Sequence, residues 1–245
     1  MPFTFAHPLA VLPFLKRKYF SATGLLVGSI VPDFESFMRM RSFSEHSHTL
    51  GGLFYFDLPL GFLLALFFHE IMKVVLLDNS PAFIRERLVV LRHFDFMPYL
   101  KSNLLIFCYS IVVGAASHIL WDSFTHGGAL MSSLIPYIND TVVPFRGAKY
   151  PMWYTLQHIS STIGLLGVIG YFLNQKPEAS LPSNPLTIFW PAVIVLTALV
   201  FYLRYLWGSH MNEGNTVVAL VSAFLLALAV VSSLLKLTQL IRVRT

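Results

Sequence analysis

Long runs of apolar residues constrain this chain more than any other feature. The clearest run, Asn215–Leu235, contains no charged residue in its 21 positions, and Asn103–Trp121 is nearly as apolar. An α-helix needs about 20 residues to cross the ~30 Å hydrocarbon core of a bilayer. Runs of this length and purity therefore predict helices that span a membrane.

Three further runs fit the same pattern with interruptions. They are Leu53–Leu77, which holds Asp57, His69 and Glu70, the glycine-rich Leu156–Leu173, and Leu186–Leu203, which contains Pro191. Transmembrane helices tolerate proline, and small residues favour close helix packing. We therefore expect an all-α fold, a polytopic membrane helical bundle of about five transmembrane helices, forming a single membrane domain over residues 1–245.

Residues 53–245 supply the transmembrane helices and loops, and the segment 1–52 precedes the first expected span. The apolar stretch Phe20–Val31 of this N-terminal segment is too short to cross a bilayer and is followed by Pro32. We expect short re-entrant or interfacial helices in this N-terminal segment, which also carries many of the candidate ligands described below.

Composition agrees with a membrane protein. The chain is 56% hydrophobic and only 12% charged, whereas soluble domains carry roughly 25% charged residues. The formal net charge is +5, but basic residues such as Lys16-Arg17-Lys18 stand beside apolar runs. Membrane lipids are therefore the expected partners, and nucleic acid is not. The single cysteine, Cys108, permits neither an intrachain disulfide nor a multi-cysteine metal site.

Five spans would place the two termini on opposite sides of the membrane. One side, face A, would carry residues 1–52, 122–155 and 208–214, and the other side, face B, would carry 78–102, 174–185 and the tail. Lysine and arginine number seven on face A and eight on face B. The positive-inside rule therefore leaves the orientation open, and the sequence leaves the oligomeric state open as well.

Histidines and carboxylates gather on face A. Seven of the nine histidines fall there or at helix ends opening to it: His7, His46, His48, His118, His126, His158 and His210. The acids Asp33, Glu35 and Asp122 fall there too. Because the topology follows from hydropathy alone, this convergence independently favours one polar site, and the residue types favour a metal site.

The strongest local signal closes the second span. His118 and Asp122 are four residues apart, so on a helix they share a face and can bind one metal ion. His126 lies a further turn along, about 12 Å from His118 on the helix axis, so one ion cannot easily take both histidines. If all three are ligands, Asp122 would bridge two ions. The alternative is that Asp122 and His126 mark the water interface.

Two loop motifs add candidate ligands. Pro32 is followed by Asp33, a candidate ligand and proton acceptor, and by Glu35, which would orient a ligand or act as a general base. His46 and His48 share a side only if the backbone between them is extended. Both motifs have a plainer interpretation as solvated loop.

Together, these motifs resemble an uncharacterised family of bacterial membrane proteins with a domain of unknown function. The motifs are Ala6-His7-Pro8, Gly28-Ser29 with Pro32-Asp33-Phe34-Glu35, His46-Ser47-His48-Thr49, Ser117-His118 through Asp122-Ser123 with Thr125-His126-Gly127, and Leu156-Gln157-His158. That family is similar to membrane-bound metal-dependent hydrolases and, more distantly, to zinc-dependent phospholipase C. The resemblance implies a multi-pass protein of the bacterial inner (cytoplasmic) membrane whose ligands are His7, Asp33, His46 or His48, His118, Asp122, His126 and His158.

The chain departs from the soluble zinc enzymes at two points. Their own amino terminus is a ligand, whereas Met1 stands six residues before His7, and Thr162 stands where a late carboxylate should follow His158. We therefore expect one or two zinc ions, with manganese or iron as alternatives. The expected function is a metal-dependent hydrolase acting on a phosphoester or lipid, with Asp33 or Glu35 as catalytic residue. The alternatives are a metal-ion transporter or sensor and a non-catalytic membrane structural protein.

Overall fold

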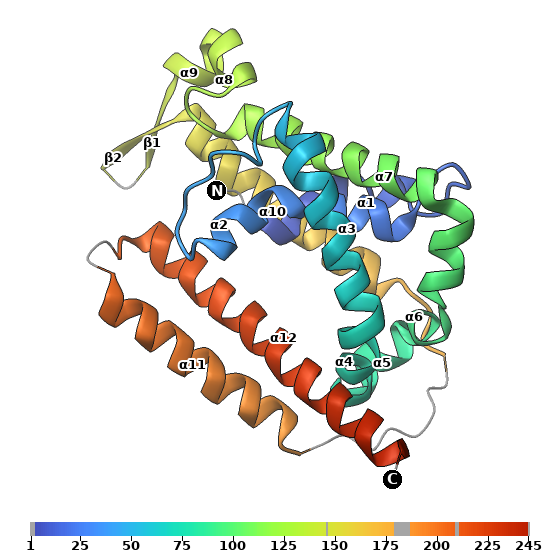
Figure 1. The fold of residues 1–245 in the computed structure, drawn as a ribbon. Helices are drawn as coiled ribbons and strands as arrows, with labels where there is room; N and C mark the ends of the chain where they lie inside the picture. The colour runs from blue at the N-terminus through green and yellow to red at the C-terminus, as the bar shows by residue number, and fades with distance from the viewer. Residues whose placement is uncertain (1–2, 146, 179–186, 209–210, 245) are drawn as a thin grey trace. The chain divides into compact units, whose positions relative to one another are not determined.

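Helices dominate the structure, a computed structural model that describes residues 3–145, 147–178, 187–208 and 211–244 (Figure 1). The chain forms two compact units, each assembled from segments distant in sequence. Unit 1 comprises Met1–Phe34, Ser44–Phe62 and Asn103–Asn174, and unit 2 comprises Glu35–Phe43, Leu63–Ser102 and Gln175–Thr245. The single membrane domain expected over residues 1–245 stays a prediction.

Five helices are long and apolar enough to cross a membrane, as hydropathy predicts. They are Leu53–Asn79, Phe96–Thr125, Met152–Leu173, Phe189–Trp207 and Glu213–Gln239. The predicted polytopic all-α fold is thereby confirmed, and most helix ends lie within a few residues of the expected ones. The expected start of the fourth span, Leu186, lies outside the described residues.

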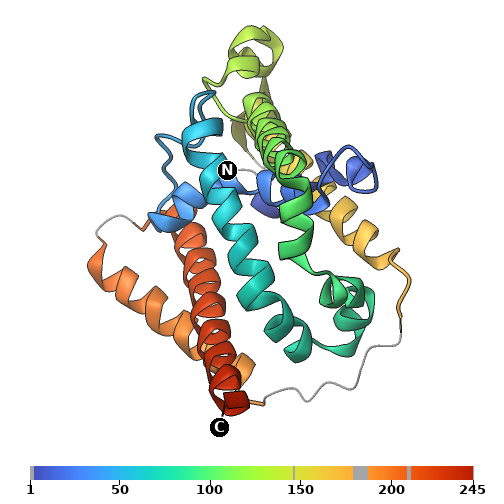
Figure 2. The ribbon, with the colours of Figure 1, turned by 45° about the vertical axis from the view of Figure 1, so that its right-hand side comes forward.

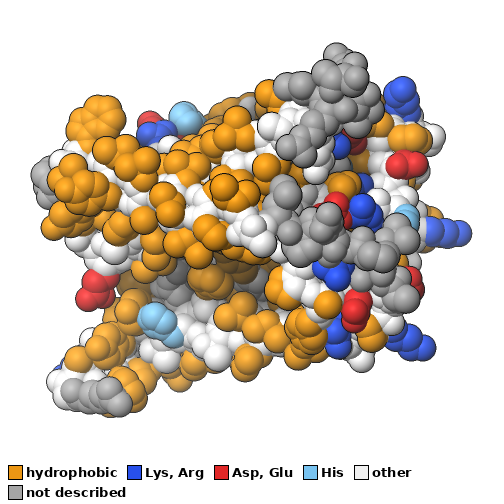
Figure 3. Space-filling view, turned by 90° about the horizontal axis from the view of Figure 1, so that it is seen from below, with side chains coloured by type: hydrophobic (Ala, Val, Ile, Leu, Met, Phe, Trp, Pro, Cys, Tyr) orange, Lys and Arg blue, Asp and Glu red, His pale blue; other side chains and the backbone are white. Residues whose placement is uncertain are grey.

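The surface of these helices is apolar. Side chains such as Leu105 and Val195 are 82% and 67% exposed, and hydrophobic side chains cover much of the surface seen in Figure 3. Soluble monomers rarely expose contiguous apolar surface on this scale, whereas lipid chains solvate it without cost. The protein is therefore a multi-pass membrane protein.

In unit 1, short helices precede the long ones. The elements in chain order are the 3₁₀ helices η1 (Thr4–Ala10) and η2 (Leu12–Phe14), α1 (Ala22–Gly28), the 3₁₀ helix η3 (Val31–Asp33), the π-helix η4 (Leu53–Asp57), the start of α3 (Leu58–Phe67), α7 (Phe96–Thr125) from Asn103, α8 (Leu130–Leu134), α9 (Pro136–Asp140), the antiparallel strands β1 (Val142–Phe145) and β2 (Ala148–Pro151), and α10 (Met152–Leu173). Helix α1 confirms the short helix expected within Phe20–Val31, and the Ser21 side chain caps it by accepting from the Gly24 N–H.

Glycines let α1 lie directly against α7 (Figure 1). A Cβ added at Gly24 or Gly28 on α1 would strike the backbone carbonyl of Phe107 or Ile111 on α7, and one at Gly114 would strike that of Leu25. Gly24 and Gly28 are four residues apart, so both face the same side of α1. This backbone-to-backbone contact fixes how far along α7 the chain after α1 emerges.

The glycines of α10 serve a second close contact. A Cβ at Gly164 would lie 2.6 Å from the Cβ of Ala6, and one at Gly167 would lie 2.5 Å from a Leu9 methyl group. The partner is therefore the short helix η1 and not another spanning helix. Gly170 meets nothing within 4 Å. This packing holds η1, and with it His7, against α10.

In unit 2, two long helices pack together and against the C-terminal part of the first spanning helix. The elements of unit 2 are α2 (Phe34–Met38) from Glu35, the rest of α3, the π-helix η5 (Phe68–Met72), α4 (Lys73–Asn79), α5 (Ala82–Arg87), α6 (Val89–His93), the first turns of α7, α11 (Phe189–Trp207) and α12 (Glu213–Arg244). Helices α11 and α12 run side by side in both ribbon views (Figures 1 and 2). Val75, Phe189, Val193, Ala227 and Val231 form their buried core.

The segment 78–102, expected as a loop, is largely helical. Besides α5 and α6, helix α7 begins at Phe96, seven residues before the expected Asn103, and Asn103 itself has non-helical angles (φ −132°, ψ 27°). Hydropathy detects only the apolar part of such a helix, because its first turns contain Pro98 and Lys101. The kink at Asn103 marks the boundary between the two units within α7.

We predict that Gly28→Ala destabilises the protein, because the new methyl group would collide with the Ile111 carbonyl. Overpacking of this kind costs on the order of 1–3 kcal/mol, measurable as a lower unfolding temperature in detergent. Gly170→Ala is the matched control, since its methyl group meets open space, and it should leave the temperature unchanged or raise it. Equal unfolding temperatures for both variants would contradict the α1–α7 contact.

Candidate metal centre

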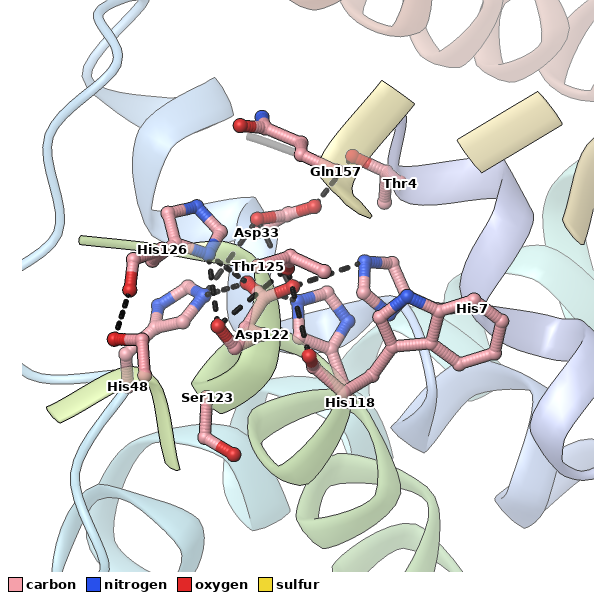
Figure 4. Close-up of polar contacts among 12 residues, drawn as sticks. Thr4, His7, Asp33, His48, His118, Asp122, Ser123, Thr125, His126 and Gln157 are labelled. Carbon is pink, nitrogen blue, oxygen red and sulfur yellow. Dashed lines mark hydrogen bonds and ion pairs between the residues drawn. The ribbon is translucent and has the colours of Figure 1, made fainter. Parts of the chain in front are cut away.

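Four side chains of unit 1 converge on one point (Figure 4). Asp33, His48, His118 and Asp122 each offer a ligand atom, and these atoms all lie within 4.8 Å of one another. Asp33 ends η3, His48 lies in the loop before η4, and His118 and Asp122 stand one turn apart on α7. Among the described residues this is the group of histidines and carboxylates arranged to hold a metal ion.

Four of the six distances between these ligand atoms are close to those in a tetrahedral ion site, and all six are below 4.8 Å. Asp122 Oδ2 lies 3.4 Å from His48 Nε2 and 3.5 Å from His118 Nε2. Asp33 Oδ1 lies 3.7 Å from each of the same two nitrogens. Ligands bound to zinc at 2.0–2.1 Å stand about 3.3 Å from one another in a tetrahedron. The side chains therefore need only small movements to close on one ion.

Two of these ligand atoms, Asp33 Oδ1 and His118 Nε2, are buried and make no hydrogen bond, although buried polar atoms are nearly always satisfied. The other oxygen of Asp122, Oδ1, is also buried without a hydrogen bond and lies on the side of His7. Two carboxylates buried together also carry two negative charges that burial makes costly. One divalent cation bound with neutral imidazoles would satisfy the free atoms and balance both charges. The donor set therefore fits a metal ion.

The carbonyl group of Ser29, at the end of α1, orients the His118 ring. Nδ1 of His118 lies 2.7 Å from this carbonyl oxygen, so Nδ1 carries the proton and donates it. This hydrogen bond occupies Nδ1 and leaves Nε2 facing the cluster, where the neutral form of the ring would offer its lone pair to an ion. Metal-binding histidines characteristically make this second hydrogen bond, which fixes both tautomer and ring orientation.

Asp33 and His48 are oriented in the same manner. Thr4 Oγ1 donates to Asp33 Oδ2 at 2.5 Å and leaves Oδ1 facing the cluster. Ser47 Oγ lies 3.0 Å from His48 Nδ1, which leaves Nε2 facing the cluster. Burial disfavours the charged form of Asp33, but attraction to His118 and the Thr4 hydrogen bond outweigh burial and hold the pKa of Asp33 below its usual value. Asp33 is therefore a carboxylate at neutral pH.

His7 and His126 adjoin the cluster at Asp122. His7 Nε2 lies 3.4 Å from Asp122 Oδ1, the oxygen turned away from His118 and His48, and its ring stacks on that of His118 at 3.7 Å. Burial, followed by the proximity of His118, lowers the pKa of His7 to about 3, so its imidazole is neutral at pH 7. His126 Nδ1 lies 3.1 Å from the Asp122 carbonyl oxygen and 3.8 Å from Oδ2.

The structure does not bring the other predicted residues into this group. His46 Nδ1 lies 3.2 Å from the Tyr55 hydroxyl. His158 is exposed on α10, with its ring 4.5 Å from that of Tyr154. Glu35 belongs to unit 2, where its Oε1 accepts hydrogen bonds from Arg39 Nε and Nη2 at 3.1 and 2.9 Å. His210 lies outside the described residues.

The sequence predicted the candidate ligands but not the groups that orient them. Thr4, the Ser29 carbonyl and Ser47 each form a hydrogen bond on the far side of a candidate ligand. A backbone carbonyl leaves no sequence signal, and Thr4 stands in an otherwise apolar stretch. The only available hint was that Ser29 and Ser47 lie within the motifs that resemble the family.

A family model described as a domain of unknown function (DUF4184) matches residues 1–234, so the chain belongs to that family. No curated protein and no solved structure matches the chain. The comparison confirms the resemblance to an uncharacterised family. The more distant similarity to metal-dependent hydrolases and phospholipase C is not found among these matches and stays a prediction.

We predict that His118→Ala abolishes stoichiometric metal binding, because it removes a ligand whose orientation the fold fixes. His158→Ala should retain the full metal content, since His158 is exposed and its ring packs against Tyr154. Elemental analysis of protein purified without chelator measures both. Equal metal content in the two variants would show that the ion, if any, is bound elsewhere.

We predict that Thr4→Val weakens metal binding by roughly tenfold, the lower limit for loss of a group that orients a ligand. Valine keeps the shape of threonine but cannot donate to Asp33. Thr162→Val is the matched control, because its hydroxyl bonds only the carbonyl of His158 on an exposed face of α10. Competition with a fluorescent chelator measures the affinities, and an unchanged affinity in Thr4→Val would contradict the orienting role.

Proposed function

We propose that the protein is a membrane-bound metal-dependent hydrolase in which Asp33, His48, His118 and Asp122 hold a divalent ion, zinc by preference. The observation that carries the proposal is the convergence of four ligand atoms, two of which, Asp33 Oδ1 and His118 Nε2, are buried without hydrogen-bond partners. Two imidazoles and two carboxylates suit zinc, and also manganese or iron. The substrate would be a phosphoester or lipid, and the location the bacterial inner membrane.

A bound ion would lower the pKa of water from about 15.7 to about 7 and polarise a phosphoryl oxygen. The side chains would do the rest. Hydrolysis forms a bond from the water oxygen to phosphorus, breaks the ester P–O bond, and moves the proton lost by water to the leaving oxygen. His48, whose side chain is 25% exposed while His118 is fully buried, marks the side from which substrate and water would approach.

Asp33 is the stronger of the two candidate proton acceptors. Its Oδ1 faces the cluster and is free of hydrogen bonds. Glu35 belongs to unit 2, where its Oε1 accepts hydrogen bonds from Arg39, and it is not among the residues that converge on the cluster. We therefore assign the proton transfer to Asp33 and a structural role to the Glu35–Arg39 pair.

A second ion would be held by Asp122 as a bridge. Its Oδ2 faces the four-residue cluster, and its Oδ1 faces His7, whose two ring nitrogens are buried without hydrogen bonds. His126 stands beside the same carboxylate. This arrangement supports the expectation of one or two ions, with the first held by four residues and the second by fewer.

We predict that the purified protein contains about one to two equivalents of metal and hydrolyses bis(p-nitrophenyl) phosphate or a phospholipid in a metal-dependent manner. Asp122→Asn should abolish the activity, because it removes the shared charge of both ions. His46→Ala is the control and should keep it, since His46 contacts Tyr55. Metal bound at full occupancy with no hydrolysis of any phosphoester would refute the hydrolase and favour a structural protein.

Metal transport is the competing function, and one observation favours it. The first spanning helix buries Asp57, His69 and Lys73, and ionisable residues within a span commonly mark an ion path. Uptake of zinc into proteoliposomes tests this alternative. Uptake that is lost in Asp57→Asn, together with no hydrolysis, would establish transport in place of the proposed reaction.

A further inference from the structure

An apolar groove of about 530 Å³ lies beside the candidate metal centre, between α7 and α10 of unit 1. Both walls are helical stripes with the same spacing: Leu120, Trp121 and Phe124 on α7, and Ile159, Ser160 and Ile163 on α10. Ligand pockets typically measure roughly 300–1,000 Å³. The groove is therefore large enough to hold part of a small molecule.

The groove and the metal centre share a wall. Trp121 directly precedes Asp122, so the groove stripe of α7 lies about 100° around the helix from the stripe that carries the ligands. The Trp121 ring lies 5.6 Å from the ring of His7, and its Nε1 donates to Ser160 Oγ across the groove at 3.2 Å. A molecule in the groove would thus have one end close to Asp122.

The lining calls for an apolar occupant. Its hydroxyl groups are already engaged: Ser117 donates to the Gly114 carbonyl at 2.7 Å, and Ser160 donates to the Gln157 carbonyl at 3.3 Å. Thr125 lies 3.4 Å from the Trp121 carbonyl. The groove contains no charged side chain. A polar or charged ligand would therefore lose its hydration without gaining partners.

The position of the groove along the two helices indicates which apolar molecule can reach it. Helices α7 and α10 are both long and apolar enough to span the membrane. The groove follows the last turns of α7 and the first turns of α10, where the two spans approach the water interface. Phospholipids place their phosphate at that depth and their acyl chains in the hydrocarbon core. A lipid chain is thus the molecule available to fill the groove.

We propose that this groove binds one acyl chain of a membrane phospholipid, with the phosphate end of the lipid directed toward Asp122. The inference rests on the proposed function only for the reaction, in which the lipid would be the substrate. Binding of the chain is independent of hydrolysis. A second copy of this chain or another transmembrane helix would be a different occupant, and the experiment below separates them.

The test uses the full chain reconstituted in phosphatidylcholine vesicles that contain phosphatidylcholine with a photoactivatable diazirine in its acyl chain. Labelling should concentrate on residues 117–125 and 156–163, as located by mass spectrometry of peptides. Ile163→Trp fills the groove and should reduce that labelling about tenfold, the scale of a steric mismatch in an apolar pocket. Leu166→Trp is the matched control, because Leu166 on the same helix is about as exposed as Ile163 (63% against 58%) but does not line the groove.

A second pair of variants guards against misfolding. Leu120→Trp fills the groove from α7, and Leu105→Trp adds the same bulk at an exposed position of α7 outside it. Uniform labelling of all spans, or equal labelling in the filled and control variants, would overturn the proposal. Such a result would mean that lipid there is unspecific or that protein fills the groove.

Activity distinguishes failure of this inference from failure of the proposed function. If the protein is a hydrolase, Ile163→Trp should lower kcat/KM for long-chain phosphatidylcholine and leave hydrolysis of soluble bis(p-nitrophenyl) phosphate unchanged. Specific labelling without any hydrolysis would support acyl-chain binding in the groove and refute the proposed hydrolase. If Ile163→Trp leaves the hydrolysis of both substrates unchanged and labelling is unspecific, the hydrolase is supported and acyl-chain binding in the groove is refuted.

Discussion

The close contact between α1 and α7 is the constraint on which the candidate site depends. Gly28 brings the backbone of α1 onto the Ile111 carbonyl, and the next residue, Ser29, places its own carbonyl 2.7 Å from His118 Nδ1. The chain then turns through η3 and delivers Asp33 opposite His118 Nε2. A larger residue at position 28 would push the Ser29 carbonyl and Asp33 away from His118, because both follow Gly28 closely in the chain.

Charge sets the second constraint. Asp33 and Asp122 are both buried and face the same pair of histidine nitrogens. In a low-dielectric interior, two such carboxylates repel each other strongly unless a cation lies between them. The fold of unit 1 holds them together through contacts outside the cluster, namely the glycines of α1 and the hydrogen bond from Thr4. Binding of a divalent ion would then remove the repulsion between the two carboxylates and so couple metal binding to the stability of unit 1.

The sequence predicted what depends on local pattern. The spans follow from hydropathy, and the pairing of His118 with Asp122 follows from their spacing on one helix. It did not reveal which of His46 and His48 would face the cluster, because that depends on the loop that Gly52 closes against the His46 carbonyl. His158 was placed at a suitable depth, but its direction depends on the rotation of α10, which hydropathy does not determine. The hydrogen bond from Thr4 to Asp33 depends on the packing of η1 against α10, which the sequence does not reveal.

The location of the centre at the end of a span reconciles two opposing demands. Metal–carboxylate attraction and ligand orientation gain from burial, since a low dielectric strengthens them. Charged groups in the middle of a bilayer would instead be costly. The last turns of α7 meet both demands, because the His118 side chain is fully buried, with the His7 ring of η1 stacked on it and the Ser29 carbonyl bonded to its Nδ1, while the His48 side chain stays 25% exposed. The same turn forms a wall of the apolar groove. A site built there can receive a polar group from the interface and an apolar chain from the bilayer, which a site in a soluble loop or at mid-membrane cannot do.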